Sequence, residues 1–287
     1  MQVSPDGARE EDPMKGWKLA YQANCWGPLG GNAVGVTSIS ELTYRTFADM
    51  AVAFRDIAAA GYRGVEVFDG NLLDYSARDF RTLLDDTGLS LVAAYSGGNF
   101  IYDEILPEEM DRIRRAADRT AELGAPHLVV GGGAQRFDGI REGDYGRLSA
   151  ALEQVAGIAA ERGLKGHYHP HLTTIGESPE QVRKIFSETS IHFCPDTAHL
   201  AAGGGDPAAM IREHRDRISY VHLKGWQKEP FAFTPLDQGD LDSAPIIAAL
   251  RDTKFDGWVA VELDAWDDPR AGAELSMAYL EKSFEPA

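Results

Sequence analysis

Side chains able to bind metal ions or move protons gather in the second half of the chain. Most are histidines and carboxylates, and they fall where short β-rich runs end. Imidazole and carboxylate together suit Mn²⁺, Fe²⁺, Co²⁺ or Zn²⁺, whereas Ca²⁺ and Mg²⁺ prefer oxygen ligands alone. The pattern is therefore typical of a site for one of the first four ions. Its candidate members are His167, His169, His171, Asp196, His199, His222, Lys224, Glu262 and Asp264.

Because successive side chains of a strand point to opposite faces, the strand sequences test whether these groups can meet. In the run 257–264, valine and leucine occupy one face, which leaves Glu262 on the other. The same test on the two preceding runs puts His222 and Asp196 on the inward face. Buried carboxylates and imidazoles that converge are costly without a cation. These residues are therefore predicted to share a divalent metal ion.

Other polar positions are open to more than one interpretation. An isolated histidine at a strand end is more often a hydrogen-bonded structural residue than a ligand, and His127, His192 and His214 are interpreted in that way. Lys224 could bind substrate or pair with a neighbouring carboxylate. Glu66 is an even choice between a substrate contact and a structural ion pair.

The elements that must position these side chains alternate along the chain. Between the β-rich runs lie helical stretches whose apolar residues recur at three- and four-residue spacing, several ending in glycine. Strict alternation indicates a parallel sheet with right-handed crossovers, and eight repeats favour a closed barrel with its chemistry at the C-terminal strand ends. The prediction is an α/β fold, a single-domain (β/α)₈ TIM barrel. The expected strands are 17–25, 64–70, 89–96, 127–133, 164–169, 191–196, 218–225 and 257–264.

Composition and net charge limit the kinds of partner that this protein is expected to bind. The net charge of −17 over 287 residues would repel a phosphate backbone, so no nucleic acid is expected. No apolar run approaches the roughly 20 residues that span a bilayer, so no membrane partner is expected. Cys25 and Cys194 provide no disulfide framework, which fits the cytoplasm. We expect residues 1–15 to be a flexible leader, with Met14 an alternative start, and 16–287 to be the catalytic domain.

Four runs in the second half resemble the xylose-isomerase-like superfamily of sugar phosphate isomerases and epimerases, and within it the inosose dehydratase branch. They are 196–210, 214–225, 235–242 and 257–264. The resemblance implies one metal ligand from each of strands five to eight. Mn²⁺ is the expected ion, with Co²⁺, Fe²⁺ and Zn²⁺ as alternatives. Carried over by position, the ligands are His169, Asp196, His222 and Glu262.

The same resemblance bears on the reaction. Epimerases of the superfamily have glutamate where this chain has His169, and they use two glutamates to move a proton between the faces of a carbon. The histidine therefore puts epimerisation in doubt and should leave the ion a stronger Lewis acid. His171 and His199 match positions that contact substrate hydroxyls. The chain also resembles catalytic subunits of C-glycoside-cleaving enzymes, which implies a base at His167.

The leading hypothesis is a metal-dependent lyase acting on a keto-sugar or keto-cyclitol through an enolate, with His167 or Glu262 as base. A keto-sugar epimerase or isomerase is the enzymatic alternative, and a non-catalytic sugar-binding subunit is the alternative of another class. A metal-dependent endonuclease would need a basic face, which the charge of −17 opposes. We expect a homo-oligomer or a hetero-oligomer with a small partner subunit.

Overall fold

The computed structural model describes residues 17–30 and 43–284, so the expected leader, 1–15, lies outside the described residues. Within those ranges, eight parallel strands form one nearly closed barrel, as predicted, in the order β8-β7-β6-β5-β4-β1-β12-β9. Isolated parallel bridges link β8 to β9 and close the circle. The strands are β1 (Lys18–Gln22), β4 (Gly64–Phe68), β5 (Ser90–Gly98), β6 (His127–Gly132), β7 (Lys165–His169), β8 (His192–Phe193), β9 (Tyr220–Leu223) and β12 (Trp258–Val261).

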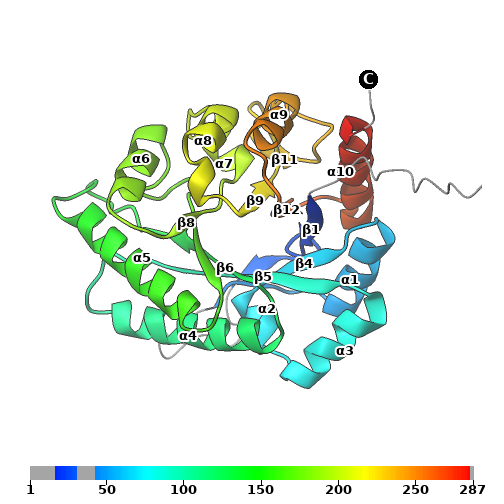
Figure 1. The fold of residues 1–287 in the computed structure, drawn as a ribbon, viewed down its shortest axis with the longest axis horizontal. Helices are drawn as coiled ribbons and strands as arrows, with labels where there is room; N and C mark the ends of the chain where they lie inside the picture. The colour runs from blue at the N-terminus through cyan, green and yellow to red at the C-terminus, as the bar shows by residue number, and fades with distance from the viewer. Residues whose placement is uncertain (1–16, 31–42, 285–287) are drawn as a thin grey trace, which may run out of the picture.

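Helices surround the strands (Figure 1). Capping residues in the sequence determine where individual helices begin. Ser178 and Gln181 form a reciprocal capping box at the start of α6, and Pro179 follows at the first position of the helix. The outer helices are α1 (Met50–Ala59), α3 (Ala77–Thr87), α4 (Leu106–Glu122), α5 (Asp144–Ala160), α6 (Pro179–Ser187), α8 (Pro207–Glu213), α9 (Ala244–Asp252) and α10 (Pro269–Phe284).

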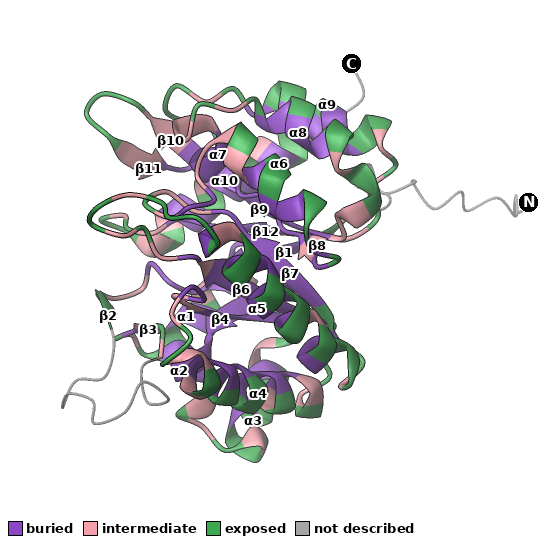
Figure 2. Cartoon of the chain, turned by 90° about the vertical axis from the view of Figure 1, so that its left-hand side faces the viewer, coloured by how far each residue is buried: buried purple, intermediate pink, exposed green. Residues whose placement is uncertain are grey.

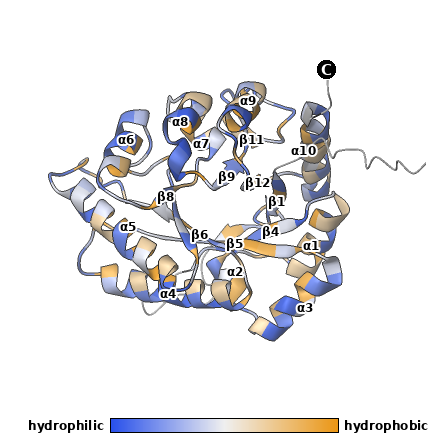
Figure 3. Cartoon of the chain, in the orientation of Figure 1, coloured by the Kyte–Doolittle hydropathy of each residue, from blue (hydrophilic) through white to orange (hydrophobic). Residues whose placement is uncertain are grey.

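The apolar core has an outer layer between strands and helices and an inner layer inside the barrel. Val259 and Val261 pack in the outer layer, whereas Ala260 and Tyr220 lie in the inner one. This is the predicted strand parity. Figure 2 shows most residues of the barrel strands in the colour of buried residues. Figure 3 shows hydrophilic colour on the outer sides of helices such as α6 and α8.

Additional elements decorate the end of the barrel at which the strands finish. Two hairpins lie on this side, β2 (Leu29–Gly30) with β3 (Arg45–Thr46), and β10 (Gly225–Gln227) with β11 (Ala232–Thr234) (Figure 2). The short helices α2 (Asp69–Leu73) and α7 (Thr197–Ala202) follow β4 and β8. The predicted strand 191–196 is wrong over its second half, because the chain leaves the sheet after Phe193 and Asp196 caps α7.

The glycine run at the end of β6 makes a tight turn. Gly132 has φ 131° and Gly133 has φ 92°, conformations that favour glycine. A Cβ on Gly132 would lie 1.9 Å from the carbonyl oxygen of Gly98 on the neighbouring strand. Among the described residues, no helix combines the length and the apolar character needed to cross a membrane.

Candidate metal centre

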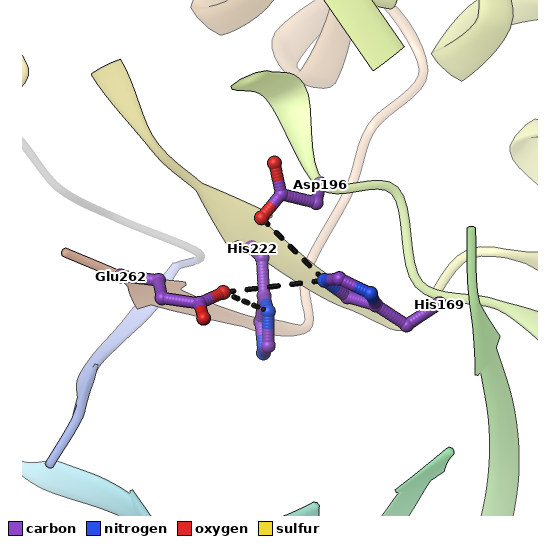
Figure 4. Close-up of side chains that lie close together, drawn as sticks. All are labelled: His169, Asp196, His222 and Glu262. Atoms are coloured by element: carbon purple, nitrogen blue, oxygen red, sulfur yellow. Dashed lines mark ion pairs between the residues drawn. The ribbon is translucent and has the colours of Figure 1, made fainter. Parts of the chain in front are cut away.

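His169, Asp196, His222 and Glu262 converge at the C-terminal end of the barrel. His169 is the last residue of β7, Asp196 is the N-cap of α7, His222 lies in β9, and Glu262 follows β12. All four are buried, and one donor atom from each lies within 4.8 Å of the other three. Figure 4 shows the four side chains pointing toward one another from separate elements. The structure therefore brings together the four residues that the resemblance implies.

Close contacts link the four groups to one another. His222 Nδ1 lies 2.6 Å from Glu262 Oε2, His169 Nε2 lies 3.4 Å from Asp196 Oδ2, and His169 Nε2 lies 4.0 Å from Glu262 Oε2 (Figure 4). Within the described part of the chain, these four atoms meet one another in ion-pair contacts, and none has a hydrogen bond of acceptable geometry. Buried polar atoms are almost always satisfied. Two nitrogens and two oxygens left facing one another match the donor set of a divalent metal ion.

A buried lysine partly balances the carboxylates. Lys224 Nζ lies 2.9 Å from Asp264 Oδ1, 3.4 Å from Glu262 Oε1 and 3.8 Å from Asp196 Oδ2. Burial alone would lower the pKa of Lys224, but these carboxylates outweigh it and raise the pKa above its ordinary value. Of the interpretations open for Lys224, the structure shows the pairing with carboxylates. Its charge is smaller than theirs, so negative charge remains for a further cation.

The two carboxylates of the cluster stay ionised. Burial would raise the pKa of Asp196 and that of Glu262, yet Lys224 and the cluster histidines hold both pKa values well below their usual range. Asp196 is further fixed because its Oδ1 accepts the backbone N–H of His199 at 2.8 Å, which leaves Oδ2 to face the cluster. Both groups are therefore in the form that binds a metal ion.

Glu66 lies beneath this cluster rather than at the mouth. It is fully buried on β4 and accepts hydrogen bonds from Gln22 Nε2 at 3.1 Å and from the hydroxyl of Tyr220. Its Oε2 also lies 2.8 Å from His222 Nε2. Glu66 thus pairs with His222 inside the barrel, and its carboxylate lies away from the open end.

His167 also lies below the cluster. It is fully buried two residues before His169, and its Nε2 is 3.0 Å from Nδ1 of His127. Its ring also contacts those of His192 and Tyr220. The structure therefore groups His167 with the two histidines interpreted as structural and does not bring it together with the candidate ligands.

His171 and His199 lie beside the cluster. Their ring centroids are 3.7 Å apart, and they lie 5.9 Å and 5.6 Å from that of His169. His171 Nδ1 is 2.7 Å from the carbonyl oxygen of Leu172, so Nδ1 carries the proton and Nε2 is left to accept one. Burial and the neighbouring His169 hold the pKa of His171 below its ordinary value. A neutral imidazole with an accepting nitrogen therefore borders the cluster.

Some residues around the centre were not predicted. Asn24 donates to Glu262 Oε1 at 3.2 Å and to Asp264 Oδ1 at 3.0 Å. The ring of Tyr95 packs edge-on 5.5 Å from that of His169. Asn24 could have been identified from the sequence, because it lies two residues after Gln22 and so faces the same side of the first expected strand. Nothing in the sequence distinguishes Tyr95, because an aromatic residue in a strand is usually a core residue.

A cavity of about 620 Å³ opens near the centre, at the ends of β4, β5 and β6. Tyr95 connects the two regions, because its ring contacts those of Tyr44 and Phe68 in the cavity wall as well as that of His169. The wall also includes Leu29, Gly98, Arg112 and Gly132. The cavity has room for a molecule of sugar size, but none of the four candidate ligands lines it, and the ring of Tyr95 lies between it and His169.

Comparison with known proteins places these features in context. The family model described as "Xylose isomerase-like TIM barrel" matches residues 54–283. An inosose dehydratase from Geobacillus kaustophilus is 26% identical over 262 residues, covering 80% of this chain and 84% of the relative. The rhizopine catabolism protein MocC from Rhizobium meliloti is 28% identical over 258 residues, covering 78% and 77%.

A similar fold occurs in the crystal structure of 3-keto-D-glucoside 4-epimerase from E. coli. The TM-score is 0.70 at 19% sequence identity, and the match covers 93% of this chain and 99% of that one. At this identity the likeness concerns the fold alone.

Proposed function

Because the chain belongs to the xylose isomerase-like TIM barrel family, we propose that it is a metal-dependent lyase acting on a keto-sugar or keto-cyclitol. The observation that carries the proposal is the convergence of four buried donor atoms, one each on His169, Asp196, His222 and Glu262. The inosose dehydratases among its relatives support a dehydratase-like elimination. Cleavage of an oxidised C-glycoside is the same chemistry with a carbon leaving group.

These four residues would hold the ion, with Mn²⁺ preferred and Fe²⁺, Co²⁺ or Zn²⁺ able to replace it. When bound, a divalent ion supplies Lewis-acid polarisation of a ketone oxygen and so acidifies the neighbouring C–H group. Two imidazoles and two carboxylates balance the ion's charge without exceeding it. A third carboxylate in place of His169 would weaken that polarisation.

We assign the proton transfer to His171 in preference to Glu262 or His167. Glu262 is a weak base, because Lys224 and His222 hold its pKa well below the usual range. His167 lies beneath the cluster and bonds His127. His171 is neutral at pH 7, and its Nε2 remains able to accept a proton.

One histidine can carry out both proton transfers of the elimination. His171 Nε2 takes the proton α to the ketone, and the C–H electrons form the new C=C bond. The β-substituent leaves with its bonding pair and takes the proton back from His171. His199, stacked on His171, is positioned to contact a substrate hydroxyl. Lys224 would hold the carboxylates in place through its contacts with Glu262 and Asp264.

The test is an assay of the chain alone against keto-inositols and oxidised C-glycosides, before and after exhaustive chelation. We expect a released leaving group with Mn²⁺ and loss of activity on chelation that Mn²⁺ restores. Full activity in the chelated protein would contradict the proposal. Deuterium entering recovered substrate without a leaving group would indicate an epimerase instead. Binding without turnover in every case would indicate a sugar-binding subunit.

A further inference from the structure

We infer that Glu66 is a positioning residue for the proposed metal centre. Its carboxylate accepts the Nε2–H of His222 and so leaves Nδ1 as the nitrogen that faces the other ligands. The inference rests on the proposed function, since it concerns how one of the proposed ligands is oriented. Neither a substrate contact nor a purely structural ion pair, the two roles considered for Glu66 from sequence, includes this effect.

The geometry places the two nitrogens of His222 in different surroundings. Nε2 lies 2.8 Å from Glu66 Oε2, and Nδ1 lies 2.6 Å from Glu262 Oε2. Glu66 is on β4, which is not a neighbour of β9, so its side chain spans the barrel interior to reach His222. One nitrogen therefore faces down toward Glu66 and the other up toward the cluster.

Glu66 is itself held in place. Gln22 donates to Oε1, and the hydroxyl of Tyr220 donates to Oε2, the same oxygen that lies against His222. Both Glu66 and Tyr220 are fully buried. Because each carboxylate oxygen has a donor from a separate strand, the acceptor that faces His222 cannot rotate away without breaking these bonds.

The chemical consequence follows from the two tautomers of a neutral imidazole. A nitrogen that carries a proton cannot bind a metal ion, and the hydrogen bond to the other nitrogen decides where the proton lies. A carboxylate fixed below Nε2 keeps the proton there and frees the lone pair of Nδ1. Without Glu66, the proton could lie on either nitrogen and the ring would lose one of its two orienting contacts.

A matched control exists in the same chain. Glu109, in α4, is also a buried carboxylate, and it accepts the backbone N–H groups of Asn99 and Phe100 and the side-chain amide of Asn99. It thus resembles Glu66 in burial and in the kind of hydrogen bonds it accepts. It has no histidine partner among the described residues, which isolates the effect on His222.

The experiment compares wild type, Glu66→Gln and Glu109→Gln by titration with Mn²⁺ and Zn²⁺. We expect Glu66→Gln to bind each ion roughly 10- to 100-fold more weakly, the usual effect of losing an outer partner, and Glu109→Gln to bind as wild type. Tyr220→Phe, which keeps the carboxylate but removes one of its donors, should fall between the two. Unfolding curves establish that each variant is folded.

A second readout reports the orientation directly. In the Zn²⁺-loaded wild type, ¹⁵N NMR should show His222 protonated at Nε2 and bound through Nδ1, with the Nε2 proton protected from exchange. In Glu66→Gln that protection should be lost. Equal affinity and an unchanged His222 signal in a folded Glu66→Gln would overturn the inference. A wild type that binds neither ion would instead overturn the proposed function, and the role of Glu66 with it.

Discussion

Asp196 and His222 are backbone partners across the seam that closes the barrel. They form an isolated parallel bridge, and the backbone N–H of His222 donates to the carbonyl oxygen of Pro195 at 3.0 Å. Together with the parallel bridge between Phe193 and Ile218, this contact holds the chain at and after the end of β8 against β9. The spacing of two proposed ligands is therefore set by the backbone and not by flexible side chains.

Replacing Asp196 by asparagine should separate metal binding from folding. The amide oxygen can keep the cap of α7, where asparagine and aspartate are about equally good, and the amide NH₂ then faces the cluster. We expect metal affinity to fall beyond the roughly 100-fold that loss of an outer partner costs, with less than about 1 kcal/mol change in the free energy of unfolding. Metal titration and urea unfolding measure the two quantities.

The control for that change is Asp206→Asn. Asp206 caps α8 in the same way, accepting the backbone N–H of Ala209 at 3.1 Å, but it lies outside the cluster. The Asp206→Asn variant should bind Mn²⁺ with the affinity of wild type. If Asp196→Asn also binds Mn²⁺ as tightly as wild type, Asp196 is not a ligand.

Lys224→Met should destabilise the metal-free protein. The change removes the buried cation that faces Asp196, Glu262 and Asp264 and leaves like charges uncompensated. The expected loss is about 3–5 kcal/mol in the free energy of unfolding, part of which added Mn²⁺ should restore. Lys184→Met, at an exposed lysine over the ring of Tyr145, should cost at most about 1 kcal/mol. Equal losses in the two variants would argue against a counter-charge role for Lys224.

His127 should make the protein sensitive to acid. Burial, aided by Lys165 and His192, lowers the pKa of His127 to about 3. The unfolded chain takes up this proton near pH 6.5 while the folded chain does not, so stability is complete above that pH and falls as the pH drops toward 3. The slope is about 1.4 kcal/mol per pH unit for one proton.

His127→Gln keeps a hydrogen-bonding group against His167 but cannot titrate. Urea unfolding between pH 7 and pH 4.5 should therefore show a shallower dependence on pH than wild type, by up to the slope of one proton. Parallel curves for the two proteins would mean that His127 is not held neutral by the fold.

The turn after β6 should not tolerate a side chain. In Gly132→Ala the new methyl would meet the carbonyl oxygen of Gly98 at a residue whose φ is 131°. We expect a loss of more than about 2 kcal/mol in the free energy of unfolding. Gly146→Ala, in the exposed face of α5 with nothing within 4 Å of the new methyl, should instead gain about 0.5–1 kcal/mol. A neutral Gly132→Ala would show that the turn adapts.

The alternation of strands and helices was sufficient to predict the fold, and the period of two within each strand predicted the direction of several side chains. The alternation of apolar residues in the last strand separates Val259 and Val261 from Glu262, and the structure has the valines in the outer core and Glu262 at the cluster. The same alternation in the run 218–225 predicted that His222 faces the inside of the barrel. A pattern with period two reports which face a residue occupies, and in a closed barrel the inner face is a small space.

The period of two in a strand does not indicate how far along the barrel axis a side chain lies. It also does not indicate which side chain it contacts across the barrel interior. His167 and His169 share one parity, yet His169 joins the cluster and His167 bonds His127 below it. Glu66 contacts His222 although their strands are not neighbours in the sheet. Both relationships depend on the stagger of strands around the whole barrel, which no single strand sequence contains.

Anomalous X-ray scattering from crystals soaked in Mn²⁺ tests the central claim most directly. The account predicts one strong peak within bonding distance, roughly 2.0–2.3 Å, of His169 Nε2, Asp196 Oδ2, His222 Nδ1 and Glu262 Oε2. Density for bound Mn²⁺ elsewhere on the protein with none among these four atoms would contradict it.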